Sequence, residues 1–440
     1  MKNKFFKGII LEGGDNKMTQ RLAIIIMTFL TSTLAYSAVW QTQNEWSQDW
    51  EHQYQNWVQT NWKFDVFSNP NSKYYGVKTD CADAVYAIRA IFAFENALPF
   101  AIQDPTRYTR VPITNEMGRW DRKASELDRV KSFINYLSGI VSTHTMPQNT
   151  VPVAINRESL VAGITYVKPK KHSYIITGWT KVGIPVRMHS TTPYAVRELA
   201  KFTAFPQYVP VDFVKFSDGY RRFKRPNELY KPISTLEGYS IEQYSVSENY
   251  DADKNKFDEY VKNKTHLEKE AVAQQTNRML NNLCEAMYHR AESIRQGHDF
   301  YLKIQEEGRS CMNANEFDQY STFSRDKRLV DQFAAFKHFV KMADNFSGTR
   351  FRNKNLSLDI VSGEAFTRYV AKEQVTNFCH IMYDSTHGER VYENSLNLKA
   401  LANRIDEGLL EQNPNTTEDR RWGHYYGEFQ TSCPTFEEIH

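Results

Sequence analysis

The sequence predicts an α+β protein whose C-terminal half is mainly helical, and three observations predict this class. Apolar residues recur at helical spacing after Cys81. Residues 151–189 hold short β-rich runs that glycines and prolines interrupt. A stripe of large apolar residues between 329 and 340 again has helical spacing. We therefore expect helices packed on an antiparallel sheet, followed by a helical region.

The first of these helices carries a cysteine at its start. Asp80 is a favourable N-cap, which places Cys81 in the first turn, and the helix ends before Leu98-Pro99. The helix dipole and the free backbone N–H groups of a first turn favour a thiolate, which is the nucleophilic form of cysteine. Cys81 is therefore the leading candidate for a catalytic residue.

Two further helices are expected in the N-terminal half. The first carries an aromatic stripe, and the second covers residues 127–141. The aromatic side chains of such a stripe can either stack on sugars or pack on a core, and packing is the commoner outcome. The stripe consists of Trp46, Trp50, Tyr54 and Trp57.

The first 38 residues resemble a secretory signal peptide. Arg21 precedes an apolar run from Leu22 to Leu34, and Ala35-Tyr36-Ser37 supplies small residues for cleavage. The run is short for a membrane span, so an uncleaved anchor is the less favoured alternative. Met18 stands where a start codon is expected. We expect an exported protein, in the periplasm or secreted, with no transmembrane segment after signal removal.

The charge of the chain argues against nucleic acid as a partner. Residues 1–38 hold five cations and two anions, so they account for the whole formal charge of +3. The remainder is neutral and has no general electrostatic footprint for nucleic acid.

The sequence predicts two domains, a catalytic domain over residues 39–240 and a helical domain over residues 266–440. Residues 241–265 are charged and poorly periodic, and are predicted to be a linker or an exposed helix.

Cysteine usage supports export. Four cysteines lie in the C-terminal half, and an even set in an oxidising compartment predicts up to two disulfides with three possible pairings. They are Cys284, Cys311, Cys379 and Cys433. Cys81 is then the odd residue, a free thiol that is a liability unless it does chemistry.

Two histidines are candidates for the base that a cysteine nucleophile needs. His172 opens one predicted strand and His189 closes the next. If the turn between the strands is centred at Thr180-Lys181, the two residues lie directly opposite each other, with Cβ atoms roughly 5 Å apart. His172 is then the base beside Cys81, and His189 orients it. His144 lies in a polar segment and is expected in a surface loop.

The order of these parts resembles the NlpC-type papain-like peptidases of bacterial cell walls over residues 70–195. The matching features are Asp80-Cys81 at a helix start, Leu98-Pro99 after it, His172 on a strand, and Met188-His189-Ser190-Thr191 on the adjoining strand. The resemblance implies a papain-like catalytic domain with a helix-borne cysteine and an antiparallel sheet. It also implies cleavage of an amide in peptidoglycan stem peptides by a Cys81-His172-His189 triad.

The resemblance also indicates oxyanion and substrate-binding residues. The family places a tyrosine upstream of the cysteine, for which Tyr74 and Tyr75 are the candidates, together with Asp80. Where the family has small residues after the cysteine, this chain has Ala82-Asp83. A carboxylate at Asp83 would oppose a thiolate if it faced the site.

Two other functions stay open at this stage. One is a non-catalytic wall-binding or envelope protein with the same fold, and the other is a transglutaminase-like acyltransferase. No motif predicts a metal or a cofactor. Ser324 has the spacing of a serine β-lactamase motif, but a helix cap with Asp326 in the first turn explains it better.

Overall fold

The computed structural model describes residues 38–106, 110–191, 194–347, 378–387, 390–424 and 431–436. The predicted signal peptide lies outside the described residues, apart from Ala38. Among the described residues, no helix combines the length and the apolar character that crossing a membrane requires.

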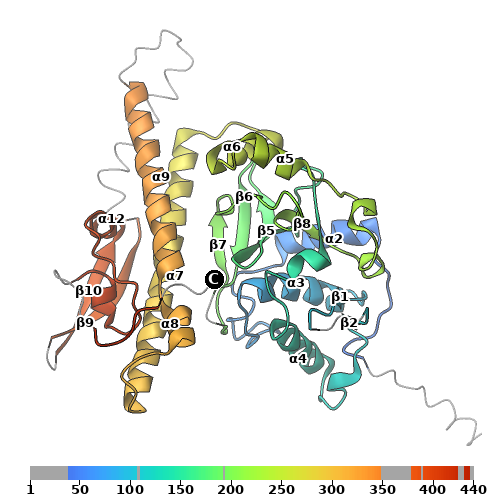
Figure 1. Cartoon of the computed structure of the whole chain (residues 1–440), viewed down its shortest axis with the longest axis horizontal. Coiled ribbons are helices and arrows are strands. Elements are labelled where there is room, and N and C mark those ends of the chain that lie inside the picture. Colours follow the sequence, from blue (N-terminus) through green and yellow to red (C-terminus); the bar gives the residue numbers. More distant parts are fainter. Residues whose placement is uncertain are drawn as a thin grey trace, which may run out of the picture.

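The N-terminal half is built on a six-stranded antiparallel sheet, as the α+β prediction expects (Figure 1). The strand order is β3-β8-β4-β5-β6-β7. The strands are β3 (Thr150–Pro152), β4 (Thr165–Lys168), β5 (His172–Trp179), β6 (Pro185–His189), β7 (Ala200–Thr203) and β8 (Gly219–Phe223). A separate pair consists of β1 (Ala101–Gln103) and β2 (Pro112–Thr114).

Three helices cover one face of this sheet: α2 (Gln48–Thr60), α3 (Cys81–Glu95) and α4 (Glu126–Ser138). Helix α3 is apolar on nearly every side and lies at the centre of the main core. The aromatic stripe packs around Phe92 of α3, so it is part of the core and not a sugar-stacking surface. Its members in ring contact with Phe92 are Trp46, Trp50, Tyr54 and Trp57.

Helices α5 (Glu242–Asn249) and α6 (Lys254–Thr265) pack against the opposite face. The sequence predicts a linker or an exposed helix here; the stretch forms two helices, and α6 buries one face against the sheet. Phe257 and Val261 are fully buried in a core that includes Tyr166 and Tyr220 of the sheet. Phe257 and Val261 lie one turn apart on α6, so these few apolar residues suffice to cover this part of the sheet.

The C-terminal half contains the expected helices and, in addition, a hairpin that the sequence analysis did not predict. Helices α7 and α9 run side by side, with the hairpin on their outer side (Figure 1). Helix α9 begins one residue before Ser324, so Ser324 lies within the first turn and is not its cap. The elements are α7 (Val272–Glu306), α8 (Ala314–Tyr320), α9 (Phe323–Ser347), β9 (His380–His387), β10 (Arg390–Asn397), α12 (Leu398–Asp406) and α13 (Glu418–Arg421).

The two halves share a core at strand β7. Phe202 packs with Leu283 of α7 and Leu329 of α9. The amide of Asn282 accepts from the backbone N–H of Thr203 at 3.1 Å and donates to its carbonyl at 3.0 Å. The Asn282 side chain thus makes the two backbone hydrogen bonds that a neighbouring strand would make at this edge of the sheet. Helix α7 is therefore fixed against the sheet.

The disulfide prediction is confirmed. Cys284 bonds to Cys379 and Cys311 bonds to Cys433, while Cys81 stays free. The bonds close loops across 95 and 122 residues of sequence. Loops of this length are those that a cross-link stabilises most in the chain-entropy account.

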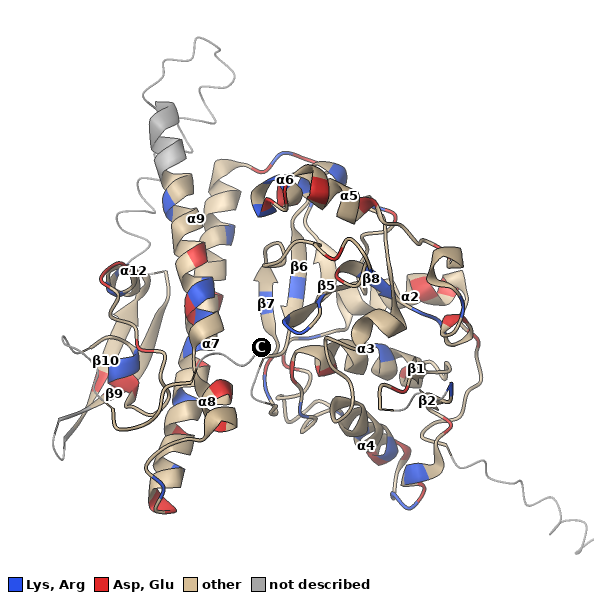
Figure 2. Cartoon of the chain, viewed as in Figure 1, with Lys and Arg blue, Asp and Glu red and all other residues tan. Residues whose placement is uncertain are grey.

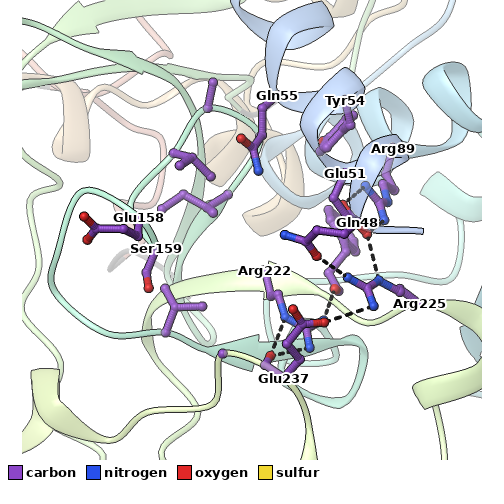
Figure 3. Close-up of a pocket in the computed structure, with 17 residues that line it drawn as sticks. Gln48, Glu51, Tyr54, Gln55, Arg89, Glu158, Ser159, Arg222, Arg225 and Glu237 are labelled. Carbon is purple, nitrogen blue, oxygen red and sulfur yellow. Dashed lines mark hydrogen bonds and ion pairs between the residues drawn. The ribbon is translucent and has the colours of Figure 1, made fainter. Parts of the chain in front are cut away.

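A buried ion pair links α2 to α3. Arg89 donates two hydrogen bonds to Glu51, at 2.9 and 2.7 Å, and its guanidinium stacks 3.5 Å from the Trp46 ring centroid. Arg225 also contacts Glu51. Glu51, Arg89 and Arg225 line a cavity of about 180 Å³, and Figure 3 shows them joined by ion pairs.

The ion pair predicts that part of the free energy of unfolding is lost at acidic pH. Burial raises the pKa of Glu51, but the charges and hydrogen bonds of Arg89, with Arg225 and Arg222, outweigh it and lower the pKa overall. A lowered folded pKa stabilises the protein above the unfolded value of about 4.3, and this stabilisation is lost as pH falls. Glu51→Gln should cost about 3 kcal/mol at pH 7, because Arg89 stays buried without its carboxylate.

Chemical denaturation at pH 7 and pH 3 checks this expectation. The difference in unfolding free energy between the wild type and Glu51→Gln should shrink at pH 3. Glu45→Gln, at an exposed position, is the control and should show little difference at either pH. A Glu51→Gln effect of the same size at both pH values would contradict the assignment.

Candidate active site

Cys81 is the first residue of α3, as predicted. Asp80 caps the helix, and its carboxylate accepts from the backbone N–H of Ala82 at 3.1 Å. The Asp83 carboxylate accepts in return from the backbone N–H of Asp80 at 2.8 Å. This reciprocal capping box fixes the turn that carries Cys81.

Two side-chain contacts fasten this turn to the end of the sheet. Ser173 of β5 donates from its hydroxyl to the Cys81 carbonyl at 2.8 Å. Ser190, directly after β6, donates to the Thr79 carbonyl at 3.0 Å and accepts from the Thr79 hydroxyl at 3.0 Å. Thr79 and Ser190 are both fully buried. The cysteine is therefore held where β5 begins and β6 ends.

The two candidate histidines lie against each other. Their ring centroids are 4.7 Å apart and the rings are perpendicular. His189 is fully buried and also contacts Tyr174 and Phe202. His172 is partly exposed. The predicted proximity of the histidines is confirmed.

The predicted register is wrong by two residues. Ile175 pairs with Met188, so the same register places His189 opposite Tyr174 and not opposite His172. The turn is longer than assumed: Thr180 donates to the Ile184 carbonyl, and the register shifts again between Ile176 and Gly178. A shift of two residues keeps side chains on the same face, which is why the rings still meet diagonally.

Cys81 and His172 line one cavity of about 450 Å³. Side chains alternate along a strand, so Ser173 points to α3 while His172 points to the other face. Cys81 lies on the α3 side of the sheet and His172 on the other side, and both line the cavity where β5 begins. Both are described residues, and no hydrogen bond joins them. His189 lies behind His172 and does not line this cavity.

The tyrosines proposed for the oxyanion site lie elsewhere. Tyr74 donates its hydroxyl to Glu95, the last residue of α3, at 2.9 Å. A helix of this length places Glu95 about 21 Å from Cys81, so the Tyr74 assignment is corrected. Tyr75 is exposed and does not line the cavity. Asp80 lies beside Cys81, but its carboxylate is engaged in capping.

The electrostatics of Cys81 oppose the predicted thiolate. Burial raises the pKa of the thiol, and the Asp80 and Asp83 carboxylates raise it further. The backbone N–H groups of Cys81 and Ala82 lower it, as a helix N-terminus should, but they are outweighed. The same burial and the neighbouring Asp80 raise the pKa of Asp83 to about 8. Cys81 is therefore a thiol at neutral pH.

The histidines are held neutral. Burial lowers the pKa of His172 well below its usual value, and the cations Arg328, Arg187 and Arg325 lower it further. The pKa of His189 is lowered by burial first and then by His172 and nearby arginines. The free protein thus favours a thiol beside a neutral imidazole over a thiolate–imidazolium pair.

Residues that no sequence motif indicated line the other side of this cavity. They come from α8 and the start of α9, and include Asp318, Ser324, Arg325, Lys327 and Arg328. The available signal was the spacing of Arg325 and Arg328, three residues apart on a predicted helix. No group of three or more His, Cys, Asp or Glu side chains within the described ranges is placed to hold a metal ion.

Comparison with protein-family models, with curated proteins and with solved structures finds no match to this chain.

The acidic neighbours predict how Cys81 reacts. Asp83→Asn removes a carboxylate that disfavours the thiolate, so alkylation by iodoacetamide at pH 9 should become roughly three- to tenfold faster. At pH 7 the gain should be smaller, because Asp83, with its pKa of about 8, is then mostly protonated in the wild type. Mass spectrometry of Cys81 gives the rates.

Cys81→Ser is the control for this measurement. It should incorporate no label, since the other four cysteines are in disulfides. An Asp83→Asn rate equal to that of the wild type at pH 9 would mean that the Asp83 charge does not act on the thiol.

Proposed function

We propose that this chain is an exported cysteine amidase or endopeptidase that cleaves peptide stems of peptidoglycan. The observation that carries the proposal is that Cys81, at the start of α3, and His172, at the start of β5, line one cavity. A nucleophile and a base from different elements that open into a shared cavity are the minimum arrangement for covalent amide cleavage. The substrate class follows from the resemblance to NlpC-type peptidases.

In the proposed reaction, Cys81 Sγ attacks the amide carbonyl as His172 takes the thiol proton. The S–C bond forms, the C–N bond breaks, and His172 returns the proton to the leaving amine. Water then hydrolyses the thioester, which releases a carboxylic acid and restores the thiol. The Cys81 backbone N–H lies at the helix start, where it can donate to the oxyanion. The packing of His189 against His172 fixes the imidazole ring.

Export is supported by the cysteine pairing. Disulfides persist in oxidising compartments, and both described bonds lie in the C-terminal half. Cys81 is the one described cysteine outside them, and it is partly exposed to the cavity. A free thiol that is kept accessible in such a compartment fits a chemical role better than a structural one.

A non-catalytic envelope-binding protein is the second candidate. The raised pKa of Cys81 favours it, as does the lack of a hydrogen bond between Cys81 and His172. Catalytic hydrogen bonds are often long or unformed in ligand-free sites, so the lack of a bond between Cys81 and His172 does not argue strongly against catalysis. We therefore rank the binding function second.

Cys81→Ala tests the proposal. It should abolish release of stem peptides from purified sacculi, measured by chromatography and mass spectrometry, because the acyl-enzyme cannot form. His172→Ala should lower the rate by at least about 100-fold, because proton transfer is lost. Circular dichroism and thermal melting should show that both variants fold.

The matched control is His144→Ala, which removes an exposed histidine outside this cavity. It should release stem peptides at the wild-type rate. Release by Cys81→Ala at the wild-type rate would remove the amidase proposal. Sacculus binding by the wild type and Cys81→Ala, with release by neither, would favour the binder.

A further inference from the structure

The side of the Cys81 cavity formed by α9 is unusually cationic. Lys170 and Lys171 contribute from the β4–β5 turn, and Arg325, Lys327 and Arg328 from α9, against Asp318 and Asp331. Of these acids, Asp331 already pairs with Lys327 at 2.8 Å. Figure 2 shows that the adjoining strands β6 and β7 carry Lys or Arg and no acidic residue. The cavity thus has an excess of positive charge.

Arg328 has no counter-ion among the described residues. Its residue exposure is 5%, and its Nε has no hydrogen-bond partner. Its guanidinium carbon lies 5.3 Å from the centroid of the Phe202 ring, so an aromatic face covers one side. A buried cation without a carboxylate is costly, and proteins normally pair it. Arg328 nevertheless opens into the cavity that holds Cys81.

A second arginine lies beside Arg328. Arg325 is 4% exposed and donates to the Ser321 carbonyl and to the Thr191 hydroxyl, at 3.3 and 3.4 Å. Burial, together with the charges of Arg197 and Arg328, lowers the pKa of Arg325 to about 9. The guanidinium groups therefore repel one another, and an anion between them would relieve this repulsion.

Two buried arginines elsewhere in the protein have carboxylate partners, whereas Arg187, Arg221 and Arg421 are buried with no ion pair to a described carboxylate. Arg290 is fully buried on α7, and Asp326 accepts hydrogen bonds from two of its nitrogens. Arg89 is paired with Glu51 in the same bidentate way. Arg328 differs from Arg290 and Arg89 in having no carboxylate partner among the described residues, and it lines the same cavity as the candidate nucleophile Cys81. Its missing partner is therefore best sought in a ligand.

We propose that the cavity binds a carboxylate of the substrate next to the scissile amide, with Arg328 as its ion-pair partner and Arg325 as a second donor. This inference rests on the proposed function. Guanidinium and carboxylate match in a bidentate geometry, which gives both affinity and orientation. The acyl donor is then an acidic peptide, and α9 of the C-terminal half supplies its recognition.

Substrate binding would also prepare the base. Arg328 and Arg325 are among the cations that hold His172 neutral. A carboxylate bound between them would cancel part of this positive field and allow His172 to take the thiol proton. The remaining groups that act on His172 and Cys81 are Arg187 on β6, the N-cap carboxylate of Asp80, and Asp83 of α3. Recognition and activation would thus be one event.

Alkylation with one anionic and one neutral reagent tests the anion site without any hydrolase assay. Iodoacetate carries a carboxylate and iodoacetamide is its neutral analogue, so the ratio of their rates at Cys81 cancels the thiolate fraction. Relative to glutathione, the wild type should favour iodoacetate. Arg328→Gln should lower the ratio by roughly tenfold, the value of one charge-assisted hydrogen bond. Arg328→Lys keeps the charge and should lower it less.

Arg309→Gln is the matched control, since Arg309 pairs with Glu316 and does not line the cavity. It should keep the wild-type ratio. A wild-type ratio equal to that of glutathione, or a ratio that is unchanged in a folded Arg328→Gln, would overturn the proposal. If Arg328→Gln does not fold, Arg325→Gln gives the same comparison.

A protection experiment separates a substrate carboxylate from a free anion. N-acetyl-dialanine with a free carboxylate should slow iodoacetamide alkylation more than its amide does and more than phosphate does. Stronger protection by phosphate would overturn the carboxylate assignment. An iodoacetate preference without release of stem peptides would retain the anion site and reject the amidase, so the two proposals fail separately.

Discussion

The hydrogen bond from Ser173 to the Cys81 carbonyl is the contact on which the site depends. It joins the first turn of α3 to the first residues of β5, elements that are some 90 residues apart in sequence. The exchange between Thr79 and Ser190 adds β6 to the same corner. Because these bonds use backbone carbonyls and small hydroxyls, they fix the position of Cys81 and leave its side chain free to face the cavity.

Electrostatics give this corner a resting state that differs from a preformed thiolate–imidazolium pair. Carboxylates stand beside the cysteine and guanidinium groups stand near the histidine, so each group is pushed toward its neutral form. An ion pair between Cys81 and His172 would need the opposite arrangement. The charges therefore favour a neutral thiol and a neutral imidazole in the free protein, and a ligand that neutralised the arginines would favour protonation of His172.

Local features of this fold could be predicted from sequence, and long-range ones could not. The cap at Asp80 follows from its residue type before an apolar helical pattern, and the packing of the Trp46 stripe follows from the spacing of its aromatic residues. The prediction that His172 and His189 share a face is correct although the predicted register is wrong by two residues, because side-chain direction repeats every two residues. Turn length and the bulge near Gly178 set the register itself. The position of Tyr74 and the α9 side of the cavity depend on tertiary packing, which no local pattern encodes.

The cavity makes the two halves of the chain one functional unit. Residues of α3 and β5 form one side and residues of α8 and α9 form the other, so neither half contains the site alone. The Asn282 amide and the core around Phe202 hold α7 against β7, and α9 packs along α7. An arginine on α9 is therefore placed as firmly as a residue of the sheet. A long helical pair that only tethered the protein would give no reason for Arg328, which is buried without a carboxylate partner among the described residues, to line the same cavity as Cys81.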